Sequence, residues 1–206
     1  MKKNYVSNST ESVRMFKNDF LESLSKVHFT VPLYVYIPVI FYCSYVALFQ
    51  TGLGMVNYLE MFLAGLFIWT LIEYVLHRYV FHFVPKSKWG LRLHFIFHGV
   101  HHDYPSDAKR LVMPLSASIP LATGFFFLYK ALLPTNYVFG FFAGFIVGYL
   151  VYDIGHYAIH HFNFKGGVWK RIKQHHMLHH YGDPARGYGV SSPLWDKIFR
   201  SDFVKK

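Results

Sequence analysis

The chain has 206 residues, of which 53% are hydrophobic and 20% aromatic, and its formal net charge is +10. This apolar content is too high for an ordinary soluble protein of this length and indicates one domain inserted in a membrane. The single cysteine, Cys43, excludes an internal disulfide, a cysteine-ligated zinc site and an iron–sulfur cluster. No basic stripe with interleaved aromatics stands apart from the apolar segments. We therefore expect no nucleic-acid partner, because membrane topology and attraction to anionic membrane lipid explain the charge better.

Residues 1–30 are polar and of mixed charge, and we expect them to form a cytosolic, amphipathic N-terminal segment. Apolar side chains recur at helical spacing between residues 9 and 27, at Val13, Phe16, Phe20, Leu24 and Val27. Ser9 or Thr10 would cap such a helix at its N-terminus. The pattern predicts a helix that lies along the membrane surface.

Four apolar stretches follow, each long enough to cross a bilayer core, which requires about 20 residues. They are expected at about 31–51, 58–80, 115–133 and 136–152. The first two form a hairpin that turns at Gly52–Gly54, and the last two form a hairpin that turns near Pro134. A soluble core of buried helices would not contain so many long apolar runs.

The distribution of basic residues predicts the orientation of these spans. Of the 21 Lys and Arg residues, only Lys130 lies near a hairpin tip. By the positive-inside rule, the N-terminal segment, the middle loop and the C-terminal region face the cytoplasm. The expected fold is an all-α integral membrane protein with four transmembrane helices in two hairpins. Its membrane domain comprises residues 31–206, and residues 81–114 and 153–206 form a cytosolic helical cap.

Ten of the 14 histidines fall into four short groups at the cytosolic side of this fold. These are His77 and His82; His98, His101 and His102; His156 and His160; and His176, His179 and His180. Residues three or four apart on a helix share a face and can aim at one point. His77 and His82 are five apart and would point about 140° apart on an ideal helix. One of the two is therefore expected where the helix ends or distorts.

Ten imidazoles are more than the four ligands of a structural zinc ion, so two metal ions share them more naturally. Metal binding requires neutral imidazole, which explains why so many histidines can be crowded together. A metal transporter would instead place its ligands near the bilayer midplane. We expect His28 to be solvated, and His94, His161 and His175 to support the ligands without binding metal. Glu73 and Asp153, one turn before a histidine group, are expected to orient histidines or line the site.

The histidine runs resemble the fatty acid hydroxylase branch of the membrane sterol desaturase and hydroxylase superfamily, and within it the fatty acid 2-hydroxylases. The resemblance extends over about residues 60–200, including the flanking stretches Lys109–Pro114 and Gly187–Phe199. The runs are His77-Arg-Tyr-Val-Phe-His82, His98-Gly-Val-His101-His102-Asp-Tyr-Pro, Tyr152-Asp153-x-x-His156-Tyr-x-x-His160-His161 and His176-x-x-His179-His180-Tyr.

This resemblance implies that the ten histidines hold a dimetal centre in the cap. The implied reaction adds one oxygen atom of O2 at carbon 2 of a long-chain fatty acid, or of the acyl chain of a sphingolipid. Tyr149, Tyr152 and Asp153 match positions beside the reacting end of the substrate and are the implied catalytic residues. Eukaryotic members often carry a fused cytochrome b5 domain, for which residues 1–30 are too short. We therefore expect a separate electron donor, such as cytochrome b5 or a ferredoxin with its reductase.

Breaking an unactivated C–H bond with O2 as co-substrate requires a redox metal, and imidazole suits iron, whereas zinc has no redox chemistry. We expect two iron ions, although zinc could occupy the site in purified protein. The expected location is a bacterial inner membrane with the metals facing the cytoplasm, with the endoplasmic reticulum as the alternative. Two other functions stay open, namely a sterol or carotenoid hydroxylase or desaturase of the same superfamily and a non-catalytic membrane metal-binding protein.

Overall fold

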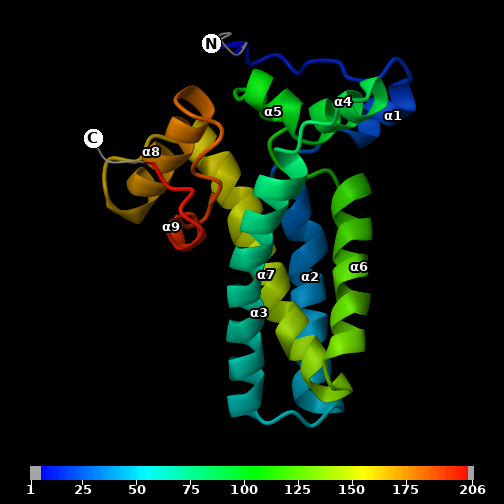
Figure 1. Cartoon of the computed structure of the whole chain (residues 1–206). Helices are drawn as coiled ribbons and strands as arrows, with labels where there is room; N and C mark the ends of the chain where they lie inside the picture. The colour runs from blue at the N-terminus through cyan, green and yellow to red at the C-terminus, as the bar shows by residue number, and fades with distance from the viewer. Residues whose placement is uncertain (1–5, 204–206) are drawn as a thin grey trace.

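The computed structural model describes residues 6–203, so residues 1–5 and 204–206 of the expected N-terminal segment and cap lie outside it. Four long helices stand together, and short helices form a cap over one end of them (Figure 1). The part of the chain that the structure describes is helical and contains no strand. The long elements are α2 with η1 (Val31–Tyr45, Val46–Gln50), α3 with η2 (Met55–Val75, Leu76–Phe81), α6 (Leu115–Leu132) and α7 (Thr135–His161).

These four elements are long and apolar enough to cross a membrane, which confirms the expected multi-pass, all-α fold. Gly52 turns the first hairpin with φ of +67°, a left-handed conformation that glycine adopts without steric cost. The second hairpin turns where Pro134 precedes α7. Pro38 and Pro120 lie inside α2 and α6, as membrane helices tolerate.

Helix α7 lies at the centre of the bundle and packs closely against α3. A Cβ atom at Gly144 would lie 1.8 Å from the carbonyl oxygen of Phe62, and one at Gly65 would lie 1.9 Å from that of Phe141. Small residues allow membrane helices to approach this closely. Since α7 continues as far as His161, its last turns rise out of this packed bundle into the cap at a fixed position.

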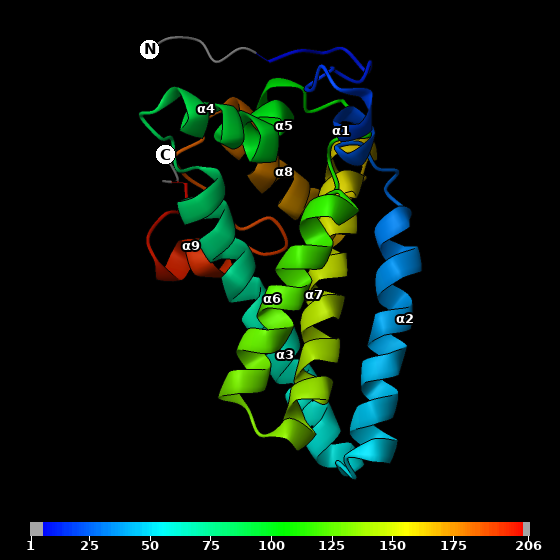
Figure 2. The same ribbon diagram turned by 90° about the vertical axis from the view of Figure 1, so that its right-hand side faces the viewer.

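The cap consists of short helices from three parts of the chain (Figure 2). They are α1 (Asp19–Leu24), α4 (Lys88–His94), η3 (Phe95–Gly99), α5 (Val100–Asp103), α8 (Gly167–Tyr181) and α9 (Leu194–Ile198). The predicted N-terminal helix over residues 9–27 is wrong, because only α1 forms, and Asn18 rather than Ser9 or Thr10 caps it.

Tertiary hydrogen bonds explain why the N-terminal helix is short. The backbone N–H groups of Met15 and Phe16 each donate to the Glu22 carboxylate at 3.0 Å, and that of Val13 donates to Asp107 at 3.1 Å. These donors are therefore satisfied without a helix. Glu22 also pairs with the Arg110 guanidinium at 2.6 Å. The N-terminal segment is thus fixed to the cap by a buried charged cluster.

Candidate metal centre

The first pair of histidines comes from a distorted helix end. Helix α3 changes at Leu76 into the π-helical segment η2, in which the His82 N–H donates to the His77 carbonyl at 3.1 Å. A π-helical hydrogen bond joins residues five apart and brings them onto one side of the helix. The Nε2 atoms of His77 and His82 are consequently 3.2 Å apart. The distortion expected from their spacing is confirmed.

The other eight histidines come from three further elements. A second π-helical segment, η3, carries His98, and the single turn of α5 that follows it carries His101 and His102. Helix α7 presents His156 and His160 one turn apart. Helix α8, which lies against the end of α7, carries the last three, at positions 176, 179 and 180.

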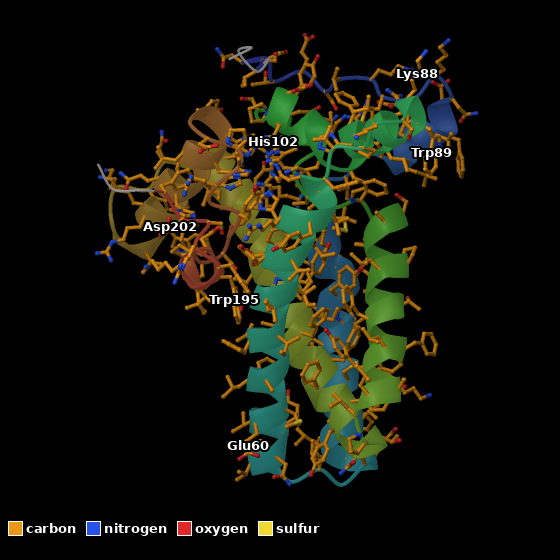
Figure 3. The ribbon with its side chains drawn as sticks, viewed as in Figure 1. Glu60, Lys88, Trp89, His102, Trp195 and Asp202 are labelled. Carbon is orange, nitrogen blue, oxygen red and sulfur yellow. The ribbon has the colours of Figure 1, made fainter. Side chains whose placement is uncertain are left out.

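The structure brings all ten predicted ligands together, in two sets of five. In each set the ligand nitrogens lie within 4.8 Å of one another. Figure 3 shows the labelled His102 among the nitrogen-rich side chains at the base of the cap. The first set is His77, His82, His98, His102 and His179, and the second set is His101, His156, His160, His176 and His180.

The spacing of the nitrogens fits metal ions and does not fit hydrogen bonding. The Nε2 atom of His98 lies 3.2, 3.0 and 2.9 Å from those of His77, His82 and His102. A neutral imidazole has one N–H, so one nitrogen cannot satisfy three such neighbours. Ligands about 2.1 Å from a shared ion would lie about 3.0 Å apart at a right angle. His176 in the second set has the same environment, with His156, His160 and His180 at 2.9, 3.0 and 3.0 Å.

The surroundings of His98, His101 and His102 favour the neutral imidazole that metal ligation requires. Burial, followed by the proximity of other histidines, holds the pKa values of His98, His101 and His102 well below 6.5. Within residues 6–203, neither ring nitrogen of the buried His101 has a hydrogen-bond partner. Since an unsatisfied buried polar atom is costly, a bound cation would remove a penalty that the protein otherwise bears.

One loop of the cap orients two ligands of the first set. The carbonyl oxygen of Tyr188 lies 2.5 Å from His77 Nδ1, and that of Arg186 lies 2.7 Å from His179 Nδ1. Carbonyl oxygens only accept, so both Nδ1 atoms carry the proton. The Nε2 lone pairs therefore remain free for a metal.

Glu73 and Asp196 hold this loop in place. The Glu73 carboxylate accepts from the backbone N–H groups of Val190 and Ser191, each at 2.8 Å, and from the Ser191 hydroxyl. Asp196 accepts from the N–H groups of Tyr188 and Gly189 at 2.9 and 2.7 Å. Glu73 was expected to orient a histidine or line the site, and it acts on His77 indirectly, through this loop.

Sequence reasoning did not single out Asp196, although it lies in the flanking stretch Gly187–Phe199. His175 supports it, with Nε2 3.3 Å from the Asp196 carboxylate. His28 is exposed and bonds the Thr30 hydroxyl at 2.8 Å. The His161 ring lies against the Tyr157 ring in a tilted arrangement, with centroids 4.5 Å apart.

The three residues expected to be catalytic lie together at the foot of the second set. Asp153 accepts from the Met113 N–H and from the Tyr149 hydroxyl, both at 3.0 Å. The Tyr152 ring stacks on His156 with centroids 5.9 Å apart. Tyr149 lies behind Asp153, whereas Asp153 and Tyr152 line a cavity beside the second set. Asp153 was expected to orient a histidine or line the site, and the structure places it in the lining.

A cavity of about 940 Å³ connects these residues with the edge of the cap. His98, His101, Tyr152 and Asp153 form its inner end. Its remaining walls are mostly apolar and come from η2, α4, η3, α6 and the N-terminal segment. Such a cavity suits an extended apolar ligand whose polar end lies next to the histidines.

Fold and site together define a multi-pass membrane protein in which two clusters of five histidines that could hold metal ions lie beside an apolar cavity. Residues 62–201 match the fatty acid hydroxylase family, and the chain belongs to this family. It is accordingly an enzyme of the hydroxylase class, as its histidine motifs predicted.

Named relatives agree with this assignment. The dihydroceramide fatty acyl 2-hydroxylase FAH1 of Arabidopsis thaliana is 37% identical over 190 residues, which cover 92% of this chain and 79% of that protein. The ceramide very long chain fatty acid hydroxylase SCS7 of Saccharomyces cerevisiae is 39% identical over 191 residues, 91% of this chain and 49% of the other. Human fatty acid 2-hydroxylase is 35% identical over 214 residues, 93% and 57% of the two chains.

The fold is also that of a solved relative. The structure of full-length scs7p, in which only the hydroxylase domain is visible, matches with a TM-score of 0.86 and 38% identity. The match covers 92% of this chain and 71% of that one. This chain spans about half the length of the yeast and human relatives.

Proposed function

We propose that this protein hydroxylates carbon 2 of a long acyl chain, carried by a free fatty acid or by a sphingolipid. The supporting observation is the apolar cavity that ends at His98, His101 and Asp153. The named relatives are hydroxylases of fatty acids, ceramides or dihydroceramides, which supports extending this substrate class to the present chain.

The two five-histidine sets would hold two iron ions, with all ten histidines as ligands. When bound, iron supplies the redox chemistry with O2 that zinc lacks. The protein contributes the rest. Most histidines of both sets are buried, which limits the access of water, and the loop around Tyr188 fixes the orientation of His77 and His179.

Asp153 and Tyr152 would position the polar end of the substrate. The Asp153 oxygens already accept from Met113 and Tyr149, and each retains a further lone pair. A carboxyl group that accepts hydrogen bonds suits an amide N–H or a hydroxyl group better than a second carboxylate. This chemistry favours an N-acyl lipid over a free fatty acid.

When one oxygen atom of O2 is inserted into the C–H bond, the other is reduced to water, and the reaction consumes two electrons. We propose that a separate protein, of cytochrome b5 or ferredoxin type with its reductase, supplies them. The basic cap-side segments support a cytosolic location for the proposed dimetal site. The relatives compared are eukaryotic, which fits the endoplasmic reticulum better than the bacterial inner membrane favoured by the sequence.

Oxygen-18 labelling tests the proposal. Purified protein, loaded with iron or with zinc and placed in lipid nanodiscs that contain a dihydroceramide, a sterol and a carotenoid, receives a reductant and oxygen-18 gas. We expect one labelled oxygen atom per hydroxylated acyl chain with iron, and no product with zinc or with His101→Ala. His28→Ala is the matched control and should retain activity. Labelled sterol or carotenoid, or metal binding without any turnover, would contradict the proposed function.

A further inference from the structure

Helix α1 buries a carboxylate and exposes three apolar side chains, beside the exposed polar residues Asp19 and Ser23. Glu22 is only 6% exposed and turns toward the cap, where Arg110 pairs with it. Phe20 is 69% exposed, and Leu21 and Leu24 are also exposed. A surface helix in water would bury these three side chains and expose the carboxylate. The outer face of α1 therefore suits lipid.

Helix α4 has the composition of a membrane-interface helix. Trp89 is 74% exposed, and Lys86, Lys88 and Arg92 lie close to it in the sequence and are exposed. In Figure 3, Lys88 lies on the side of α4 away from the four spans, and Trp89 lies on the side toward them. Tryptophan is enriched at headgroup level, and basic residues are attracted to anionic lipid there.

The two helices lie above different spans. Figure 2 shows α4 above the end of α3 with η2, and α1 above the end of α6. The cavity is lined by Leu76 and Val80 of η2 on one side and by Ala117 and Pro120 of α6 on the other. Leu21 and Leu24 of α1, with Trp89 and Leu93 of α4, line it on the cap side.

We propose that α1 and α4 lie in the headgroup layer of the leaflet on the cap side, and that the space between η2 and α6 beneath them is a lateral door. An acyl chain of a lipid in that leaflet enters through this door and reaches His98 and His101. The position of the two helices in the membrane is independent of catalysis, whereas the role of the door rests on the proposed function.

The depth of Trp89 tests the position of α4. Wild-type protein and Trp89→Phe are reconstituted in nanodiscs of anionic phospholipid with bromine at a shallow or a deep acyl position. The difference between their emission spectra isolates Trp89 from the other three tryptophans. We expect shallow bromine to quench this difference signal and aqueous iodide to leave it largely unquenched. Full quenching by iodide and none by bromine would place Trp89 in water and overturn the proposal.

A blocking substitution tests the door. Ala117→Trp places a large side chain between η2 and α6, and Ala131→Trp, on an exposed position near the other end of α6, is the matched control. A phospholipid with a spin label on its acyl chain reports binding as an immobilised signal, whether or not the protein turns over. We expect Ala117→Trp to lose most of this signal with its metal content unchanged, and Ala131→Trp to retain it.

Pro120→Trp gives a second block from an exposed position, should Ala117→Trp fail to fold. An immobilised signal of wild-type size in a folded, metal-loaded blocking variant would rule out this door. If the blocking variants lose the signal but the wild-type protein hydroxylates no acyl lipid, the lateral door is supported and the proposed function is rejected.

Discussion

His101 and His102 are adjacent in the sequence, yet their imidazoles belong to different sets. His102 Nε2 lies 2.9 Å from His98 Nε2 in the first set, whereas the His101 ring lies 4.5 Å from the His156 ring in the second. The single turn of α5 therefore joins both sets through one peptide bond. Any movement of this turn displaces a ligand from each set.

Substitution of these two residues should remove different metals. We expect His101→Ala and His102→Ala each to reduce bound metal from about two ions per chain to about one. Turnover should fall about 100-fold or more. Loss of a group that only hydrogen-bonds a metal ligand already lowers metal affinity or activity by about 10–100-fold. Metal analysis of purified protein measures the stoichiometry. Retention of both ions in both variants would show that the two sets are not the metal sites.

Replacement of Asp153 by Asn should separate metal binding from turnover. The variant retains an acceptor for the Met113 N–H but weakens the bond from Tyr149. We expect both metals to remain and turnover to fall by about 10-fold or more, the size of a misplaced positioning group. Tyr149→Phe, which leaves the carboxylate intact, should cost less. Full activity of Asp153→Asn would exclude a role for this residue in catalysis.

Glu73 should matter for the first set although it contacts none of its ligands. Glu73→Ala removes the acceptor of two backbone N–H groups, those of Val190 and Ser191. Each unsatisfied group costs about 1–3 kcal/mol of stability where it is buried. The loop that orients His77 then loosens, and the first metal should dissociate more readily than the second. Chelator-release kinetics measure this difference. Glu60→Ala, at the opposite end of α3, is the control and should release both metals at the wild-type rate.

Acid should release the N-terminal segment through Glu22. Burial alone would raise the pKa of this carboxyl group, but the Lys26 ammonium, two backbone N–H groups and Arg110 outweigh it and lower the pKa from 4.5 to about 2. A lowered folded-state pKa stabilises the attachment above pH 4.5 and loses that stability as the pH falls toward 2. The protection of the Met15 and Phe16 amides from hydrogen exchange, relative to their intrinsic exchange rates at the same pH, should therefore fall below about pH 4.5.

Glu22→Gln should produce the same loss of protection at neutral pH, because the amide cannot replace the charge. Asp19→Asn, on the exposed side of α1, provides the comparison and should leave exchange unchanged. Equal protection in wild type and Glu22→Gln at pH 7 would show that the segment is attached in some other way.

The spans and the ligands were predictable from the sequence because each depends on local pattern. Long apolar runs determine the four helices, and the five-residue spacing of His77 and His82 required the distortion that η2 provides. The division of ligands into two sets was not predictable. It depends on how η2, α5, α7 and α8 pack, which no single motif records.

The loop that orients the ligands was hidden for a related reason. Glu73 bonds Ser191 across 118 positions of the chain. Such a contact has no periodic signal. The prediction of the N-terminal helix was wrong for the opposite reason, because a local pattern was present and tertiary contacts overrode it. The spacing of Val13 and Phe16 is helical, but their backbone N–H groups bond Asp107 and Glu22 instead.

The most direct test of the central claim is lipid mass spectrometry of cells that express this chain, compared with cells that express His101→Ala. Fragmentation locates any added oxygen atom along the acyl chain. We expect one added oxygen at carbon 2, next to the carboxyl or amide carbonyl, in the wild type only. The contradicting result is the absence of added oxygen from acyl lipids in cells that are confirmed to contain iron, reductant and metal-loaded protein. It would overturn the assignment of this chain as an acyl 2-hydroxylase.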